Sequence, residues 1–479
     1  MQNAELSISK PSKWLFYSFS VITLLSIFIA AISEFYYTLA LPAFFLLVYF
    51  TIVDFRTIFF ILLAFIPLST EIFLPNGFGT DLPTEPFIVG LMMVYLLFVS
   101  RHSERMEAGF FRHPITTLLY LHFGWILITT VTSSLFFISF KYLLAKFWYI
   151  ITFYFLAGML VRKERDVRQV FWFIFIPLMI TVFYSLAKHS VYGFSFESVF
   201  RVLHPFYRNH VAYAAILATF VPFLWFARQW YPIFGFKWLL LAGSLLIVLI
   251  AIQLSYTRAA YVAIFIAIGA YYMIRFKLMK YALAAGTIIA IALATYLTVN
   301  NRYLEFAPNY EQTITHTDFN NLLEATYQLE DISTMERVFR WVAAGYMSKE
   351  KPIFGFGPGN FYSFYWPYTV SSFETYVSDN PERSGIHSYY LMVLVEQGYV
   401  GLVIYLALLF YILIRGEQIY HRMQSIRKKQ IVMIALLMII IISALQLIND
   451  LLETDKIGPF FFMSMAILVN MDVESKKSV

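Results

Sequence analysis

Long apolar runs dominate the chain, and short polar segments separate them. The runs approach the roughly 20 residues that a helix needs to cross about 30 Å of hydrocarbon, and the strand-like alternation typical of a barrel does not occur. This pattern predicts an all-α polytopic membrane protein with about 12–14 transmembrane helices. The predicted spans begin near Trp14, Phe35, Thr57, Pro86, Pro114, Tyr142, Val170, Val211, Trp238, Ala259, Tyr281, His387, Ile431 and Ile457.

One polar segment interrupts the pattern. It covers residues 299–386, which makes it 88 residues long among loops that are otherwise short. We therefore divide the chain into an N-terminal transmembrane bundle (1–298), a large, partly helical loop (299–386) and C-terminal spans with a short tail (387–479). A long loop of this kind is predicted to carry the working part of the molecule.

Charge predicts the orientation of the spans. With the N-terminus in the cytoplasm, the cytoplasmic segments hold 22 of the 35 lysines and arginines but 9 of the 29 acidic residues, as the positive-inside rule requires. Both termini are then cytoplasmic and the long loop is periplasmic. The start, Met1–Lys13, is too short for a cleavable signal peptide, so the first span is expected to remain as an anchor. The net charge of +6 is divided between two membrane faces and does not indicate nucleic-acid binding.

Composition excludes several classes of chemistry. A hydrophobic fraction of 60% with 13% charged residues excludes an ordinary soluble domain. The absence of cysteine excludes disulfides, a thiol nucleophile and cysteine metal sites. The sequence contains neither a P-loop nor a Rossmann glycine pattern. An enzyme acting on the outer face therefore needs a substrate that arrives already activated.

Arginines at the predicted outer ends of the spans are the first candidate residues. Arg258 lies in Ser255-Tyr-Thr-Arg-Ala-Ala260, between two apolar runs with no loop to shield it. An intramembrane arginine normally faces a partner or a wet cavity, although snorkelling to the headgroups is an alternative. Arg208, Asn209 and His210 open another span, where a guanidinium and a helix start form either an anion cradle or an ordinary interfacial cap.

The long loop supplies further candidates. Arg337 and Arg340 are three residues apart in an amphipathic pattern, so they share a helix face, which solvent or lipid headgroups would also explain. Gly357 belongs to a glycine-rich turn that either brings backbone amides close to a ligand or only reverses the chain. His387 begins an apolar span, and Glu396 is expected about 13.5 Å further down the same helix.

These residue types suit an anionic substrate such as a pyrophosphate. Guanidinium groups neutralise a leaving diphosphate through bidentate hydrogen bonds without Mg²⁺. A neutral imidazole accepts a hydroxyl proton near neutral pH, although a lone interfacial histidine is more often structural than catalytic. The sequence shows no pattern of metal ligands, so no cofactor and no metal are expected.

The chain resembles the O-antigen ligase and polymerase family of bacterial membrane glycosyltransferases. The resemblance covers roughly 201–413, and about 14 spans instead of the family's more typical 12 lean towards polymerase-like relatives. Ser388 stands where the family usually has asparagine, which weakens any role for that side chain. The segments that carry the resemblance, in the family's order, are Arg208-Asn-His-Val-Ala-Tyr213, Ser255-Tyr-Thr-Arg-Ala-Ala260, the stretch Arg337 to Phe361, and His387-Ser-Tyr-Tyr-Leu391 with Glu396-Gln-Gly398 and Gly401.

The resemblance implies a GT-C-like fold in the bacterial inner membrane with its active site on the periplasmic face. It implies a glycan donor linked through pyrophosphate to undecaprenol, and an acceptor such as lipid A-core or another saccharide. By this resemblance, Arg208, Arg258 and Arg337 hold the pyrophosphate together with the neighbouring Arg340. His387 activates the acceptor hydroxyl, and transfer inverts the anomeric centre. Asn209, His210, Gly357 and Glu396 are supporting residues.

Three alternatives differ in what they predict. A repeat-unit polymerase uses the same donor and differs from a ligase only in its acceptor. A transporter of lipid-linked glycans should place its charges at the midplane of discontinuous helices and show two related halves, whereas the unusual cations here cluster at span ends. A structural scaffold explains neither Arg258 nor the glycine-rich turn.

Overall fold

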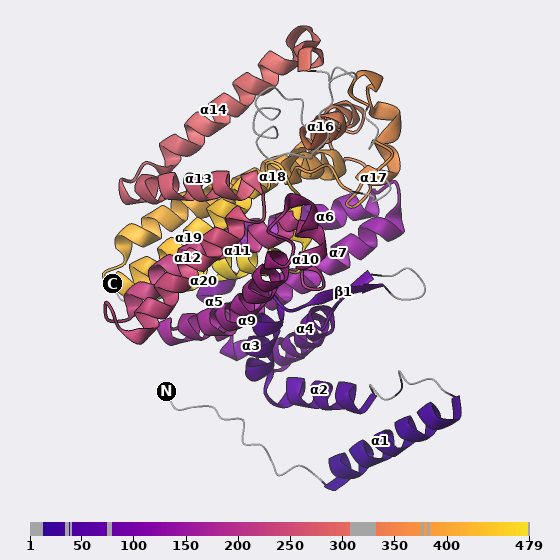
Figure 1. Ribbon diagram of the computed structural model, residues 1–479, viewed down its shortest axis with the longest axis vertical. Coiled ribbons are helices and arrows are strands. Elements are labelled where there is room, and N and C mark those ends of the chain that lie inside the picture. Colours follow the sequence, from indigo (N-terminus) through magenta and orange to yellow (C-terminus); the bar gives the residue numbers. More distant parts are fainter. Residues whose placement is uncertain are drawn as a thin grey trace.

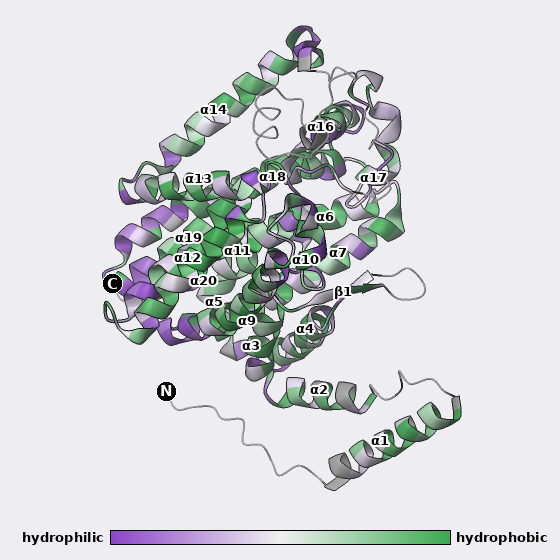
Figure 2. Cartoon of the chain, in the orientation of Figure 1, coloured by the Kyte–Doolittle hydropathy of each residue, from purple (hydrophilic) through white to green (hydrophobic). Residues whose placement is uncertain are grey.

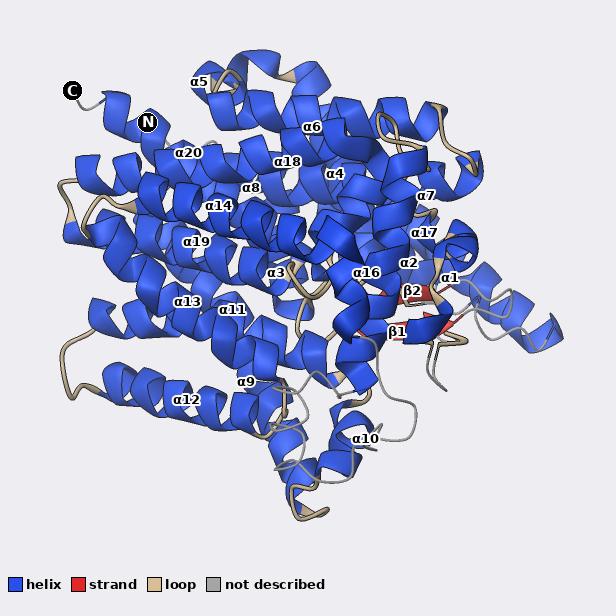
Figure 3. Ribbon diagram, turned by 90° about the horizontal axis from the view of Figure 1, so that it is seen from above, coloured by secondary structure: helices blue, strands red, loops and turns tan. Residues whose placement is uncertain are grey.

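The computed structural model describes residues 13–33, 38, 41–73, 79–306, 332–374, 378–380 and 384–477. These residues form a helical bundle (Figure 1) in which the two strands of one short hairpin lie at one end of the helices (Figure 3). The long helices are α1 (Lys13–Ser33), α2 (Leu41–Val53), α3 (Phe55–Phe65), α4 (Thr84–Arg101), α6 (Pro114–Val131), α7 (Phe136–Ile150), α9 (Glu164–Ser190), α11 (His210–Ala227), α12 (Phe236–Gln253), α13 (Arg258–Arg275), α14 (Met279–Thr298), α16 (Ile332–Glu350), α18 (Tyr389–Arg422), α19 (Ile426–Leu445) and α20 (Gly458–Lys477).

Short elements connect these helices. The strands of the hairpin pair antiparallel, with Thr70 opposite Leu82. Helix α7 continues through a π-helical turn, Ile151–Leu156, into α8. The short elements are α5 (Ala108–Phe111), α8 (Ala157–Leu160), α10 (Val199–Leu203), α17 (Phe361–Phe364), β1 (Thr70–Phe73) and β2 (Gly79–Leu82).

The all-α polytopic prediction is confirmed, with a different count of spans. Within the described ranges, ten helices are long and apolar enough to cross a membrane, and α1 and α3 contain shorter apolar stretches. The sequence predicted 12–14. The difference arises because α2 and α3 are only 13 and 11 residues long, and because the last turns of α20 carry Asp472, Glu474, Lys476 and Lys477.

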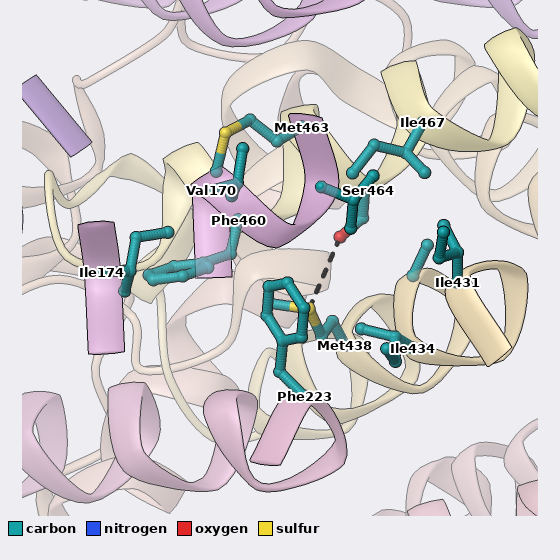
Figure 4. Close-up of a pocket in the computed structure, with 12 residues that line it drawn as sticks. Val170, Ile174, Phe223, Ile431, Ile434, Met438, Phe460, Met463, Ser464 and Ile467 are labelled. Carbon is teal, nitrogen blue, oxygen red and sulfur yellow. Dashed lines mark hydrogen bonds between the residues drawn. The ribbon is translucent and has the colours of Figure 1, made fainter. Parts of the chain in front are cut away.

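The core of the bundle is mostly apolar. Figure 2 shows hydrophobic residues along the middle of the helices and hydrophilic residues near the C-terminus and at helix ends. A small cavity between α9, α11, α19 and α20 is lined by residues such as Val170, Phe223 and Met438 (Figure 4). One polar group in its wall, the Ser464 hydroxyl, donates to the Met438 sulfur at 3.9 Å. This cavity is a packing defect in the core, away from the candidate residues.

Alternate loops of the bundle gather at two opposite ends. The hairpin β1–β2, α16 and α17 lie on the side opposite the C-terminus in Figure 1. The connection 446–457 reaches the hairpin, because Lys456 Nζ donates to the carbonyls of Ile66 and Ser69, each at 2.8 Å. We call this end the loop face; its described segments are 66–73, 79–83, 191–209, 254–257, 299–306, 332–374, 378–380, 384–388 and 446–457. Whether the loop face is periplasmic stays a prediction.

Candidate functional site

The start of α11 places Arg208 on the loop face. The Asn209 side chain accepts a hydrogen bond from the backbone N–H of Ala212 at 2.8 Å, so Asn209 is the N-cap of the helix. Arg208 precedes this cap with an exposed side chain. His210, the first helical residue, lies half-buried within electrostatic reach of Arg337 in α16. Two segments that are over 120 residues apart in sequence therefore meet here.

Arg258 is the first residue of α13, beside the start of α11. The Thr257 hydroxyl donates to the carbonyl of His210 at 3.2 Å and links the two helix starts. The preceding Tyr256 has a φ of +54°, which gives the chain a sharp turn between α12 and α13. The Arg258 side chain is half-buried, and its charge adds to the positive potential of the first helical turn. This end of α13 favours an anion.

The two arginines of α16 differ in their surroundings. Arg340 is buried, and its guanidinium forms a 2.6 Å ion pair with Glu336 and donates to the carbonyl of Gly385 at 3.2 Å. Arg340 therefore fixes the segment just before His387 and already has a counter-ion. Arg337 is half-buried and lies near both His387 and His210.

His387 is held in an unusual conformation at the centre of these cations. Its φ of +57° lies in the left-handed region, which is costly for a side chain with a Cβ and common at functional sites. Burial, and then the charges of Arg340 and Arg337, lower the pKa of the imidazole to about 3. The ring is therefore neutral near pH 7. Among the described residues no hydrogen bond is made to it, so a ring nitrogen can accept a proton.

The helix after His387 reverses its direction. Gly398 has φ +71° and ψ −178°, so α18 is two helices joined at this residue. The rings of Tyr389 and Tyr405 lie 5.1 Å apart, whereas sixteen residues of unbroken helix span about 24 Å. The Tyr389 N–H donates to the Gln446 carbonyl at 2.9 Å, so His387 lies at the level where α19 ends.

This reversal corrects the prediction that His387 begins one long span with Glu396 further down it. Glu396 lies near the outer turn of the helix pair, and its carboxylate accepts hydrogen bonds from the N–H groups of Gly359 (2.8 Å) and Phe361 (3.2 Å). The sequence does not distinguish a reversed helix pair from one long helix, because the residues on both sides of Gly398 are apolar. The difference lies in the φ and ψ of Gly398.

The glycine-rich turn packs on this helix pair. The Gly357 N–H donates to the Glu396 carbonyl at 2.9 Å. A Cβ at Gly355 would lie 2.5 Å from the main chain of Glu396. Of the two interpretations left open by the sequence, chain reversal with close packing fits these contacts. Gly357 and Glu396 thus dock the long loop on α18.

Asp450 is a site residue that the sequence analysis missed. It lies in the connection 446–457, and its carboxylate occupies the space where a side chain at Gly385 would be. Burial raises the pKa of Asp450, and the charges of Arg340 and Arg208 oppose this shift. The carboxylate is therefore near both cations. The polar run after Leu447 is the signal that marks it, but nothing in the sequence indicates its neighbours.

The candidate site thus combines five segments of the loop face. Arg208, Arg337, Arg340, His387 and Asp450 interact electrostatically, and Arg258 joins them through the bond between Thr257 and His210. In the described part of the chain, no three His, Asp or Glu side chains are placed to hold a metal ion. The site combines these cations with a neutral imidazole and one half-buried carboxylate.

A comparison with family models matches a segment that contains most of the candidate residues. Residues 243–406 match the family model described as O-antigen ligase. The match covers about a third of the chain. The matched segment contains Arg258, Arg337, Arg340 and His387, whereas Arg208 precedes it. No curated protein matches the chain. The resemblance drawn from the sequence is confirmed by the match, and the roles of individual residues stay predictions.

Proposed function

We propose that this protein is an inner-membrane glycosyltransferase of the ligase type. It transfers a glycan from undecaprenyl pyrophosphate to a hydroxyl of a saccharide acceptor, such as lipid A-core, at the loop face. The observation that carries the proposal is the neutral imidazole of His387 beside the guanidiniums of Arg337 and Arg340, within a domain that matches the ligase family.

The cations suit the departing pyrophosphate. Arg208, Arg258 and Arg337 come from three elements that converge on the loop face. Guanidiniums bind phosphate oxygens with two parallel hydrogen bonds and remain charged at all relevant pH values. Their charges stabilise the negative charge that develops on the leaving group as the glycosidic bond breaks. Arg340 has a different role: it positions the segment of His387 through Glu336 and Gly385.

His387 is the base in this proposal. A neutral imidazole takes the proton of the acceptor hydroxyl while its oxygen attacks the anomeric carbon. Attack on the face opposite the pyrophosphate inverts that centre. The low pKa of free His387 makes the ring a weak base before the donor binds. A bound pyrophosphate places negative charge beside the same guanidiniums, which raises the basicity of the imidazole when it is needed.

The sidedness of the charges supports a periplasmic reaction. The positive-inside pattern predicts that the long loop lies outside the cytoplasm, where nucleotide sugars are absent and lipid-linked donors are the activated substrates. Both termini are then cytoplasmic.

The test is the surface glycan profile of a deletion strain that is complemented with wild type, His387→Ala or His204→Ala. The control, His204, is an exposed histidine on the same face. Wild type and His204→Ala should restore the glycan, whereas His387→Ala should not, at equal protein levels in the membrane. Full restoration by His387→Ala would overturn the catalytic role.

The same profile separates the ligase from its alternatives. Lipid-linked polymer that accumulates without reaching its final acceptor indicates a ligase. Collapse to single repeat units indicates the polymerase that shares this donor. Unchanged glycans in every strain would contradict glycosyl transfer and favour the transporter.

A further inference from the structure

A lysine lies buried in the helical segment Phe136–Leu160, which is long and apolar enough to cross a membrane. Lys146 is the eleventh residue of α7, and its side chain is 2% exposed. Ten residues of helix separate it from the start of α7 by about 15 Å. A charge at this depth is costly and normally marks a functional region with a specific partner.

The partner of Lys146 comes from the loop face. Lys146 Nζ lies 2.5 Å from Glu453 Oε1 and donates to the hydroxyl of Tyr389 at 3.2 Å. The Tyr142 hydroxyl donates to the same oxygen of Glu453 at 2.8 Å. The rings of Tyr142, Tyr389 and Phe462 surround the ammonium with centroids at 5.6–5.7 Å. The Lys146 ammonium is surrounded by these protein groups and is closed to a ligand, so Lys146 is not itself a ligand-binding group.

Glu453 differs from Lys146 in its access to the site. Its side chain is 25% exposed. One carboxylate oxygen takes both protein hydrogen bonds, and the other, Oε2, accepts none from the residues that the structure describes. An ionised carboxylate accepts up to about four hydrogen bonds. Glu453 therefore presents unused acceptor capacity at the surface of the site.

Two neighbours connect Glu453 with the candidate site. Tyr389, which shares Lys146 with Glu453, is two residues from His387. Asp450, one helical turn before Glu453, lies against Gly385 and interacts with the charge of Glu453. Glu453 is thus adjacent to the candidate site, because Asp450 interacts with the charges of Glu453, Arg340 and Arg208.

We propose that Glu453 Oε2 binds a hydroxyl of the acceptor saccharide, and that Lys146 is the positioning residue that holds Glu453 in place. This inference rests on the proposed function. A carboxylate repels pyrophosphate and accepts hydrogen bonds from neutral hydroxyls. The site therefore separates its two substrates by charge, with the diphosphate at the arginines and the polyhydroxyl acceptor at Glu453.

The decisive variant exchanges the pair: Lys146→Glu with Glu453→Lys. The exchange keeps a buried ion pair, but it places an ammonium where the acceptor hydroxyl would bind. Membrane levels should stay near wild type, and the acceptor KM should rise about tenfold or more, as expected for a lost charge-assisted hydrogen bond, with the donor KM unchanged. The neutral double variant Lys146→Met with Glu453→Gln should also raise the acceptor KM and leave the donor KM unchanged. It replaces the exchanged pair if that pair fails to fold, because it leaves no buried charge.

The matched control is the same exchange in the pair Lys428–Glu474, at 3.0 Å on the opposite face of the bundle, which should leave both KM values unchanged. An unchanged acceptor KM in the exchanged and neutral Lys146–Glu453 pairs would overturn the inference and make the pair purely structural. A raised donor KM with an unchanged acceptor KM would overturn it as well.

A binding readout separates this inference from the proposed function. Oligosaccharides released by mild acid from the host's own surface polysaccharide should raise the Tm of purified wild type and not that of the exchanged pair. If wild type transfers no glycan but shows this difference, the proposed function fails and the saccharide site stands. If the oligosaccharides stabilise wild type and the exchanged pair equally, the saccharide site is overturned, whatever the transfer result.

Discussion

At the scale of single residues, the state of His387 depends on its neighbours. The imidazole is half-buried beside two guanidiniums, and both the loss of solvation and their charges disfavour its charged form. Asp450 offsets part of this positive charge from the other side. The site thus keeps a neutral base among cations, and any change in those cations should appear in the pH dependence of the reaction.

Arg337→Gln should move the acid limb of kcat/KM for transfer to higher pH. In wild type the lowered pKa keeps His387 neutral throughout the ordinary range, so protonation removes the base only at low pH. Without Arg337 the repulsion weakens and the pKa rises towards its ordinary value, so the base is lost earlier as pH falls. Burial remains the larger cause, so the shift should be partial.

The pH profile of purified protein checks this prediction, with Lys349→Gln as the control. Lys349 is an exposed cation in the last turn of the same helix, and its removal should leave the limb in place. If the acid limb of kcat/KM lies at the same pH in wild type and Arg337→Gln, Arg337 does not lower the pKa of His387.

The chemistry of single residues was only partly predictable. Arg208, Arg258 and His387 are polar residues at the ends of apolar runs, Arg337 belongs to an amphipathic pattern in the long loop, and the family resemblance supplied their roles. The ion pair of Lys146 was not predictable, because its partner is 307 residues away. Asp450 was missed for the same reason: its neighbours come from distant parts of the chain.

At the scale of elements, Gly398 decides where His387 lies. Its backbone conformation turns α18 back on itself, and the loop packs tightly over the turn, since a Cβ there would lie 2.1 Å from the Ile353 carbonyl. Hydropathy located the spans, because it measures how apolar a segment is. It did not reveal the reversal, because an apolar helix pair and one long helix have the same composition.

Gly398→Ala should destabilise the protein and reduce transfer together. Alanine at a φ of +71° is strained, typically by about 1–3 kcal/mol, and it also collides with the loop. Gly243→Ala is the control, because no atom lies within 4 Å of a Cβ at that helical position. Thermal unfolding in detergent should show a lower Tm for Gly398→Ala only. Equal Tm values would mean that the turn tolerates a side chain.

At the scale of the whole molecule, the two ends of the bundle differ in their ionic contacts. On the face opposite the loops, the fully buried Asp472 pairs with Arg415 at 2.9 Å and Arg422 at 2.7 Å, which ties α18 to α20. On the loop face Arg337 and Arg340 lie near His387. The charge bias of the sequence predicted the orientation of the spans, but it did not show which charges pair.

Cysteine labelling tests the orientation, since the chain has no cysteine of its own. Ser190→Cys on the loop face should react with a membrane-impermeant maleimide in spheroplasts. Ser425→Cys on the opposite face should react only after the membrane is permeabilised. Both positions are exposed and lie outside the site. The reverse pattern would place the active site in the cytoplasm and exclude a periplasmic reaction.

The buried pair between Lys146 and Glu453 also bears on how the protein is made. Ribosomes add about 5–20 residues per second, so the 307 residues between the two partners take roughly 15–60 s to synthesise. During that time α7 must wait with its lysine uncompensated, at a cost of about 2.5–3.5 kcal/mol on an insertion scale. A nascent chain that stops before Glu453 never neutralises this charge. Such a fragment should therefore be less stable in the membrane than the complete chain.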